Sequence, residues 1–466
     1  RTQALSRLRA KAQELQPGDW LLNFGGWVEE QFIDEPRGFS LDELDDIAPA
    51  NPVLLDVNYS HRYVNSAFFE LMGISVDSPD VVNAVEATAD QLDRTHNNPI
   101  TEAMVVRDQD GRATGRINGG GDAFRQIFAN FPVLDRQQTK EGIKSVVAAA
   151  LSNGLTTVYD GGGFGIRWET YDITAEMAAD NELDMRIFHT KFMRPNTPAE
   201  AREESAKLQL LRPNYSNDRQ ALIGLGEVIY GPHHDGFSYA MEASEDNLEG
   251  LRTMFGAAAT GDWNVQMHMV QPRTMHLALD LMDELEPAHA FKPLRWIFIH
   301  ADMINQPVLE RMRKYGMSPS FRSNGLIGGA ARQDLLEKFG DKILGMPNLR
   351  MTQASGIPWT FGSEAPRINV LDPLMSLAWA VTGKRFYDGS VVNNRTVSRE
   401  EALIAHTRNG ALAIFQENNL GQIRNGFQAD FVVLDRDYLE VAEEQLFEVE
   451  VAMTVVAGEV VFQAAP

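Results

Sequence analysis

Residues 264–301 read NVQMHMVQPRTMHLALDLMDELEPAHAFKPLRWIFIHA. An apolar run (264–270) is followed by a helical stretch, PRTMHLALDLMDEL (272–285), and by a second apolar run (294–301). Two short β-rich runs joined by a helical stretch predict parallel strands with a crossover helix between them. The last part of each run carries a histidine, His268 in the first and His300 in the second.

The same alternation extends in both directions, from about residue 140 to residue 363. The predicted strands are GLTTVYD (154–160), MRIFHTKF (185–192), ALIGLGEVIY (221–230), NVQMHMV (264–270), LRWIFIHA (294–301), MSPSFR (317–322) and PWTFGS (358–363). Repeated β-then-α units predict an α/β fold, a parallel sheet covered by helices. Seven strands can be counted, whereas a (β/α)₈ TIM-type barrel has eight.

The two ends of the chain lack this alternation. Strand-like runs at 429–437 and 451–462 have no helix between them, and the second predicts a hairpin with its turn at Ala457-Gly458. Residues 16–130 hold two strand-like pieces, DWLLNFGGW (19–27) and NPVLLDVN (51–58), among Pro- and Gly-rich loops. We therefore predict three regions, which are a cap or insertion (1–135), a barrel (136–420) and a small β appendage (421–466).

Composition excludes several classes of function. The formal net charge is −23, which argues against nucleic acid or anionic membrane as a partner, because such binding depends on Lys and Arg. No stretch of about 18 apolar residues predicts a membrane span. The chain has no cysteine, so disulfides, thiolate nucleophiles and cysteine metal sites are excluded. Compartment and oligomeric state, a homodimer included, stay open.

Four polar side chains come at or near the ends of predicted strands, where such barrels carry their active sites. They are Glu227, His268, His300 and Glu364. Two histidines and two carboxylates form a plausible ligand set for Zn²⁺ or a similar divalent metal. Each residue also has a structural interpretation: a hydrogen-bonded histidine, an ion-pair partner in the barrel wall for Glu227, or a helix cap for Glu364.

The remaining motifs predict less. There is no G-x-S-x-G, P-loop or complete Rossmann fingerprint. His233 and His234 are adjacent in the turn-like GPHHDG, which favours a substrate loop over two ligands to one metal. The aromatic and polar candidates for a small-molecule pocket are Trp27, His61, His234, Phe321 and Arg322. Arg322 would pair with a substrate carboxylate or lie on the surface.

Several segments, in this order, resemble the amidohydrolase superfamily, and specifically its YtcJ-like amidohydrolase 3 group, which includes AepA-like sequences. They are GDWLLNFGGW, NPVLLDVNYSHRYVNSAFFELMGI, VVRDQDGRATGRI, the GLTT strand at 154–157, and GQIRNGFQADFVVLDRD followed by TVVAGEVVF. The resemblance implies a (β/α)₈ barrel, with residues 421–466 as the C-terminal half of a small β-sandwich.

The resemblance also implies roles for the four candidate residues. His268 and His300 match the metal histidines of barrel strands 5 and 6. Glu227 falls at the strand-4 position that bridges two metals, often a carboxylated lysine. Glu364 matches the strand-8 acid that accepts the proton of the attacking water. The implied cofactor is one or two divalent ions, zinc first, with manganese or iron as alternatives.

Three departures from the family pattern matter. The H-x-H motif of strand 1 is absent, the strand-8 acid is Glu364 where the family usually has Asp, and the segment after strand 5 reads His268-Met-Val-Gln-Pro. In the family, H-x-H and strand 1 lie upstream of the position of Arg1. We therefore expect that segment as an earlier stretch of the same product, a separate piece or a bound fragment; the alternative is a truncated product.

Two hypotheses follow. The first is a metal-dependent hydrolase of an amide-type C–N bond in a small molecule, with Glu364 as the general base. The second is a non-catalytic relative that binds a ligand or a regulatory partner, which the three departures favour. Metal content separates the two hypotheses, because only the first needs a bound ion.

Overall fold

The computed structural model describes residues 1–58, 60–77, 100, 102–119, 127, 131–163, 167–323, 325–327 and 330–465. Parts of the predicted cap region, among them residues 78–99 and 120–126, lie outside the described residues. The chain divides into two compact units. The first unit comprises Arg1–Val133, Ile327–Lys338 and Glu364–Val370, and the second comprises Leu134–Leu326, Phe339–Ser363 and Leu371–Pro466.

The first unit is built on a five-stranded sheet in the order β1-β2-β3-β5-β4. Its strands are β1 (Leu21–Asn23), β2 (Val53–Val57), β3 (His61–Val64), β4 (Val105–Arg107) and β5 (Ala113–Asn118). β1 and β2 are parallel, and the other pairs are antiparallel. The sequence indicated β1 and β2 but not the three other strands.

The described helices of the first unit are α1 (Thr2–Ala12), α2 (Leu41–Ile47), α3 (Ser66–Leu71) and all but the last residue of α11 (Ala330–Phe339), with the 3₁₀ turns η1 (Glu29–Gln31) and η2 (Glu102–Met104). α2 begins at a capping box. The Ser40 hydroxyl accepts from the main-chain amide of Glu43, and the Glu43 carboxylate accepts from the main-chain amide of Ser40. The apolar side chains of α2, α3 and the sheet form one core.

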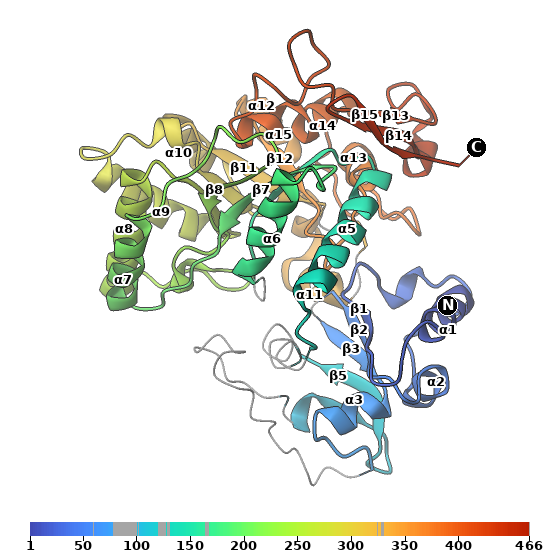
Figure 1. The fold of residues 1–466 in the computed structure, drawn as a ribbon. Helices are drawn as coiled ribbons and strands as arrows, with labels where there is room; N and C mark the ends of the chain where they lie inside the picture. The colour runs from blue at the N-terminus through green and yellow to red at the C-terminus, as the bar shows by residue number, and fades with distance from the viewer. Residues whose placement is uncertain are drawn as a thin grey trace. The chain divides into compact units, whose positions relative to one another are not determined.

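The second unit carries a seven-stranded sheet in the order β12-β11-β10-β9-β8-β7-β6 (Figure 1). Every neighbouring pair is parallel. The strands are β6 (Thr157–Asp160), β7 (Arg186–Lys191), β8 (Gln220–Leu225), β9 (Asn264–Met269), β10 (Ile297–His300), β11 (Ser318–Arg322) and β12 (Thr360–Gly362). This is the α/β TIM-type fold that the alternating pattern predicts.

Helices follow the strands of this sheet, and neighbouring helices pack on one another. Their bounds are α5 (Arg136–Ser152), α6 (Trp168–Ala179), α7 (Pro198–Leu208), α8 (Glu245–Thr260), α9 (Pro272–Leu285), α10 (Gln306–Lys314), α12 (Leu349–Ser355), α13 (Pro373–Thr382), α14 (Arg399–His406) and α15 (Arg408–Ala413), with 3₁₀ turns η3 (Gly231–His233), η4 (Lys292–Leu294), η5 (Gly340–Gly345) and η6 (Glu443–Glu448). No helix in the described part of the chain is long and apolar enough to cross a membrane.

The β9–α9–β10 segment shows why the sequence folds this way. α9 has Pro272 in its first turn, and its buried side chains recur at helical spacing, as in Met275, Leu279 and Met282. β9 alternates instead. Val265, Met267 and Met269 lie in the apolar core with the helices, whereas Asn264, Gln266 and His268 lie on the other face of the sheet.

A three-stranded antiparallel sheet follows the barrel strands. Its members are β13 (Phe431–Leu434), β14 (Val451–Val456) and β15 (Glu459–Gln463), in the order β13-β14-β15. The β14–β15 hairpin turns at Ala457-Gly458, as predicted. The sheet packs on α5, where Val456 joins Val147 in one apolar cluster.

Candidate metal centre

Three of the predicted ligands come from consecutive strands of the barrel sheet. Glu227 follows β8, His268 lies in β9, and His300 ends β10. β8, β9 and β10 are neighbours, and adjacent strands lie about 4.8 Å apart. The order of the strands therefore brings together side chains that are far apart in the sequence.

The three side chains meet at one point. Glu227 Oε2 lies 3.3 Å from His268 Nδ1 and 3.0 Å from His300 Nε2. One nitrogen or oxygen from each residue lies within 4.8 Å of the others, and among the described residues this is the one such group of three or more His, Asp or Glu. Glu364 is not a member of it. The two imidazoles and one carboxylate supply the donor types that zinc prefers.

Glu227 lies outside the strand in which the sequence placed it, so that prediction is corrected. The apolar run 221–230 predicted one strand through Glu227, but β8 ends at Leu225. Gly226 has a φ of 148°, outside the extended region, and its amide donates to the carbonyl of Lys191. The regular strand therefore ends before the glycine, and the Glu227 carbonyl still accepts from the amide of His268 in β9.

The charges of the three residues support one another. Burial raises the pKa of Glu227, but hydrogen bonds from His268 and His300 outweigh burial, and the pKa lies well below its usual value. Burial lowers the pKa of His268, but the hydrogen bond to Glu227 and its negative charge reverse that effect and raise it. Glu227 is therefore an ionised carboxylate in a partly buried place, which favours a cation beside it.

The backbone turns the His300 side chain toward the cluster. In the β9–β10 ladder, His268 pairs with Ile299 and His300 pairs with Met269. Paired residues of neighbouring strands share a face, so a regular strand would place His300 with Met269, in the apolar core. His300 instead has a φ of 68°, and this left-handed conformation lets its imidazole reach Glu227. Such an unfavourable backbone in a non-glycine residue is typical of functional sites.

Two further residues contact the His268 ring. Its Nε2 lies 2.9 Å from the main-chain oxygen of Asp235. The ring of His234 stacks on it, with centroids 3.9 Å apart. His234 was predicted as a substrate-loop residue, but Asp235 was not predicted at all. The histidines of GPHHDG were candidates because an imidazole can bind a metal or a substrate. Asp235 contacts His268 through its main-chain oxygen, and the type of a residue does not indicate such a contact.

Arg322 and Phe321 end β11 and point in different directions. Arg322 contacts the buried Asp302, with Nη2 3.4 Å from Oδ2. Its positive charge acts to lower the pKa of His268. Phe321 is 1% exposed and lies in the apolar core, with its ring 6.0 Å from that of Trp359.

Two more candidates, Trp27 and His61, belong to the first unit and are placed only within it. The ring of Trp27 lies 5.6 Å from that of Phe39, in an aromatic cluster. Nε2 of His61 is 2.6 Å from Oε1 of Glu29, which also accepts from the Tyr63 hydroxyl. Burial raises the pKa of Glu29, but these two hydrogen bonds outweigh it and lower the pKa to about 2.

Glu364 is likewise part of the first unit. It follows β12, which ends at Gly362, and it has a φ of 53°. Its main-chain oxygen accepts from the amide of Ile368. The structure therefore places Glu364 just after the last barrel strand, as the sequence predicts.

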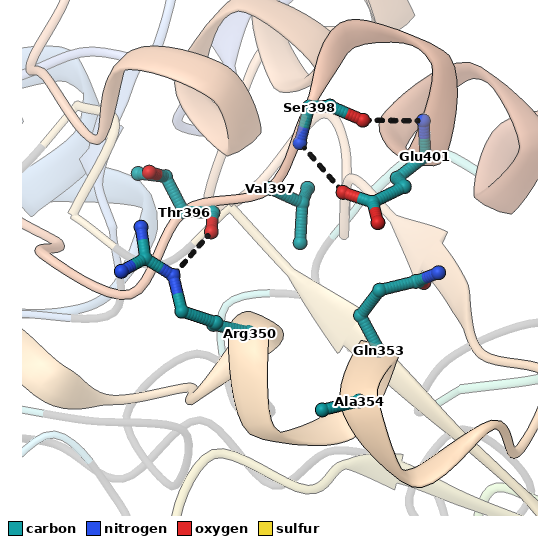
Figure 2. Close-up of a pocket in the computed structure, with 7 residues that line it drawn as sticks. All are labelled: Arg350, Gln353, Ala354, Thr396, Val397, Ser398 and Glu401. Atoms are coloured by element: carbon teal, nitrogen blue, oxygen red, sulfur yellow. Dashed lines mark hydrogen bonds between the residues drawn. The ribbon is translucent and has the colours of Figure 1, made fainter.

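A cleft of about 470 Å³ lies beside α12 and the start of α14 (Figure 2). None of the predicted site residues lines it. Ser398 and Glu401 bond each other in the capping box of α14, and Arg350 Nε donates to the carbonyl of Thr396. These polar groups serve the local backbone, so the cleft offers no chemistry comparable with that of the three-residue cluster.

Comparison with known proteins adds independent evidence. A model of the amidohydrolase family matches residues 2–462. The YtcJ protein of Bacillus subtilis, named as an amidohydrolase, is 23% identical over an alignment of 478 residues, gaps included, that covers 98% of this chain and 83% of that protein. The N-substituted formamide deformylase of Arthrobacter pascens is 21% identical over an alignment of 467 residues, gaps included, that covers 98% of this chain and 81% of that enzyme.

Solved structures support the fold. The crystal structure of a metal-dependent hydrolase from Pyrococcus horikoshii superposes with a TM-score of 0.60 at 16% sequence identity, covering 94% of this chain and 81% of that one. A related hydrolase from Pyrococcus furiosus gives 0.59 at 19% identity, with 94% and 82% covered. At these identities the likeness concerns the fold.

Proposed function

This chain belongs to the amidohydrolase family, and we propose that it is a metal-dependent hydrolase of an amide-type C–N bond in a small molecule. The observation that carries the proposal is the cluster of Glu227, His268 and His300, whose ligand atoms lie within 4.8 Å of one another. The two Pyrococcus relatives of the fold are described as metal-dependent hydrolases, which supports the same class.

The donor set fits a divalent cation. His268 would bind through Nδ1 and His300 through Nε2, since these atoms face Glu227, and the Glu227 carboxylate would hold one ion or bridge two. Zinc accepts this mixture of nitrogen and oxygen ligands, and manganese or iron are alternatives. The bound ion would acidify a water molecule and polarise the carbonyl of the substrate.

Glu364 is proposed as the general base. Its carboxylate would accept the proton of the attacking water and return it to the leaving nitrogen, so that the C–N bond breaks and an acid and an amine are formed. Its place just after β12 and the match to the strand-8 acid of the family support this role. Compared with aspartate, glutamate has one more methylene, which moves the carboxylate farther from its backbone.

The substrate class is supported by a relative and by two nearby side chains. The relative from Arthrobacter pascens is named for the removal of formyl groups from N-substituted formamides, which supports a C–N bond as the target. His234, stacked on His268, and Arg322, whose charge reaches His268, would contact the substrate. Roles for Trp27, His61 and Phe321 stay predictions from the sequence.

The first prediction tests the metal centre directly. Wild-type protein and the variants His268→Ala and His300→Ala are loaded with Zn²⁺, freed of unbound ion and measured by elemental analysis. Wild type is expected to retain one or two ions per chain and each variant a small fraction of that. Release of amine from a panel of N-formyl and N-acyl compounds is expected to fall at least about a hundredfold in both variants.

His276→Ala is the matched control, since His276 lies on α9 and contacts Arg311 rather than the cluster. It should retain metal and turnover. If either His268→Ala or His300→Ala retained the full metal content, the histidine replaced in that variant would not be a metal ligand. A protein that binds metal tightly but hydrolyses no member of the panel would favour the non-catalytic ligand binder instead.

A further inference from the structure

The segment that follows η3 contacts the end of β9. Within it, Asp235 is 1% exposed, and its main-chain oxygen lies 2.9 Å from Nε2 of His268. A carbonyl oxygen accepts but cannot donate, so Nε2 of His268 carries the hydrogen in this contact. The opposite ring nitrogen, Nδ1, is the one that faces Glu227 Oε2 at 3.3 Å.

The carboxylate of Asp235 holds this carbonyl in place. Oδ1 accepts from the amide of Val270 at 2.7 Å, and Oδ2 accepts from the amide of Gln271 at 2.9 Å. The Thr274 side chain also bonds to the carboxylate. These amides lie between β9 and α9, so one buried side chain joins its own loop to the strand that carries His268.

The side chain of Gln271, at the start of α9, also bonds to the loop that contains Asp235. Nε2 of Gln271 donates to the main-chain oxygens of Gly236 at 3.0 Å and Phe237 at 2.7 Å. Gln271 is the N-cap position of α9, and a carboxylate near a helix N-terminus is favoured by the helix dipole. The loop and the start of α9 therefore bond to each other through both Asp235 and Gln271.

We infer that Asp235 is a positioning residue of the proposed metal centre, which holds its own carbonyl against His268 Nε2 and so presents Nδ1 to the metal. Metal-bound histidines commonly donate their second ring N–H to a carbonyl or carboxylate, and this contact fixes the tautomer and the ring orientation. The inference rests on the proposed function, because it assumes that His268 is a ligand.

The second prediction is the effect of Asp235→Asn on metal binding. The amide keeps the size of the carboxylate but replaces one acceptor oxygen with an NH₂ group that faces a main-chain N–H. We expect the Kd for Zn²⁺, measured on metal-free protein by competition with a chromophoric chelator, to rise by about 10- to 100-fold. Gln271→Leu removes the two side-chain hydrogen bonds to the loop and keeps the Asp235 side chain unchanged. We expect it to raise the Kd for Zn²⁺ by a smaller factor.

Asp372→Asn is the matched control. The Asp372 carboxylate also accepts from two main-chain amides, those of Leu374 and Met375 at the start of α13, and burial raises its pKa as it does for Asp235. The control should lose comparable stability in urea and keep the wild-type Kd for Zn²⁺. If Asp235 contributed only to folding, Asp235→Asn and Asp372→Asn would have the same Kd for Zn²⁺.

The tautomer of His268 can also be measured. It would stay the same in Asp235→Asn if Asp235 contributed only to the stability of the fold. In zinc-loaded protein with ¹⁵N-labelled histidine, the signals that vanish in His268→Ala belong to His268. Wild type should show a protonated Nε2, and Asp235→Asn should shift or broaden that signal, while the other histidine signals stay in place.

The outcomes separate this inference from the proposed function. If His268→Ala loses zinc but Asp235→Asn keeps both the wild-type Kd and the His268 signal, the positioning role is wrong and the metal centre stands. If His268→Ala keeps the wild-type Kd, the ligand assignment itself is wrong. If Asp235→Asn does not fold, the Kd and His268 signal of Gln271→Leu decide, and wild-type values there overturn the inference.

Discussion

His406 ends α14, and its ring stacks on that of Phe361 with centroids 5.4 Å apart. Burial lowers the pKa of His406 to about 4, whereas an unfolded histidine titrates near pH 6.5. As the pH falls below about 6.5, the unfolded chain takes up a proton that the folded chain does not accept until about pH 4. The stability that depends on the neutral ring is therefore complete above pH 6.5 and is lost as the pH falls toward 4.

The third prediction follows from that sign. Between pH 7 and pH 4.5, His406→Phe should lose about 2 kcal/mol less stability than wild type, because its ring has no proton to take up. Urea unfolding at a series of pH values measures this difference, whatever the offset between the proteins at pH 7. Parallel stability curves across this range would show that His406 is not the group responsible.

Single residues were predictable where residue type carries the chemistry. Glu227, His268 and His300 were identified because a carboxylate and two imidazoles came at strand ends, and the structure brings them together. The orientation of His300 was beyond prediction, since alternation along a strand places it on the wrong face. Asp235 was missed because its contact with His268 is made by the backbone.

At the scale of the element, the end of β8 decides where Glu227 lies. A Cβ on Gly226 would lie 2.3 Å from the main-chain oxygen of Gln266 in β9, and the φ of 148° suits only glycine. The fourth prediction is that Gly226→Ala destabilises the protein by at least about 3 kcal/mol and weakens zinc binding, because strand and backbone both have to move.

Gly142→Ala is the control for that substitution. Gly142 lies in α5, and a Cβ there meets no atom within 4 Å. It should stabilise the protein by about 0.5 to 1 kcal/mol, because alanine loses less backbone entropy than glycine in a helix. Thermal melts of the three proteins measure both effects, and equal melting temperatures for Gly226→Ala and wild type would contradict the packing argument.

Elements were predicted best where hydrophobic periodicity is strong and contacts are local. α9 (Pro272–Leu285) has the predicted bounds, since Pro272 marks its start and apolar residues recur at helical spacing. In the first unit, the paired residues of β3 and β5 are more than 50 positions apart in the sequence. A local sequence pattern does not predict which distant strands pair. The sequence thus indicated β1 and β2 while leaving the rest of that sheet undetermined.

At the scale of the whole second unit, one buried ion pair joins the C-terminal sheet to the barrel. Arg186 of β7 is fully buried and bonds both carboxylate oxygens of Asp430, at 2.7 and 3.1 Å. The fifth prediction is that Asp430→Asn costs about 3 to 5 kcal/mol, because it removes the buried counter-charge of the guanidinium and leaves only the exposed Asp218 carboxylate. Urea unfolding measures the cost.

Asp218→Asn is the matched control for that pair. Asp218 also bonds Arg186, at 3.4 Å, but its side chain is 58% exposed. Exposed ion pairs contribute about 0 to 1 kcal/mol, so the control should stay close to wild type. Similar losses in the two variants would mean that burial does not set the strength of this contact.

The architecture of the second unit was predictable because each β-then-α unit repeats the same hydrophobic pattern. The seven parallel strands follow from it, and the family match over residues 2–462 agrees. The final hairpin follows instead from two strand-like runs with a turn at Ala457-Gly458. The ion pair between Arg186 and Asp430 was not predictable, since it joins residues 244 positions apart.

The backbone of His300 has a consequence for how this protein could change over generations. A φ of 68° costs an imidazole-bearing residue free energy that glycine would not lose. A mutation to glycine there would relax the backbone while removing a proposed metal ligand, and we expect the variant to fold. If it folds, misfolding and degradation would not remove it, and only selection on the proposed activity would keep a histidine at this position. A good yield of folded protein is accordingly no sign that the site is intact.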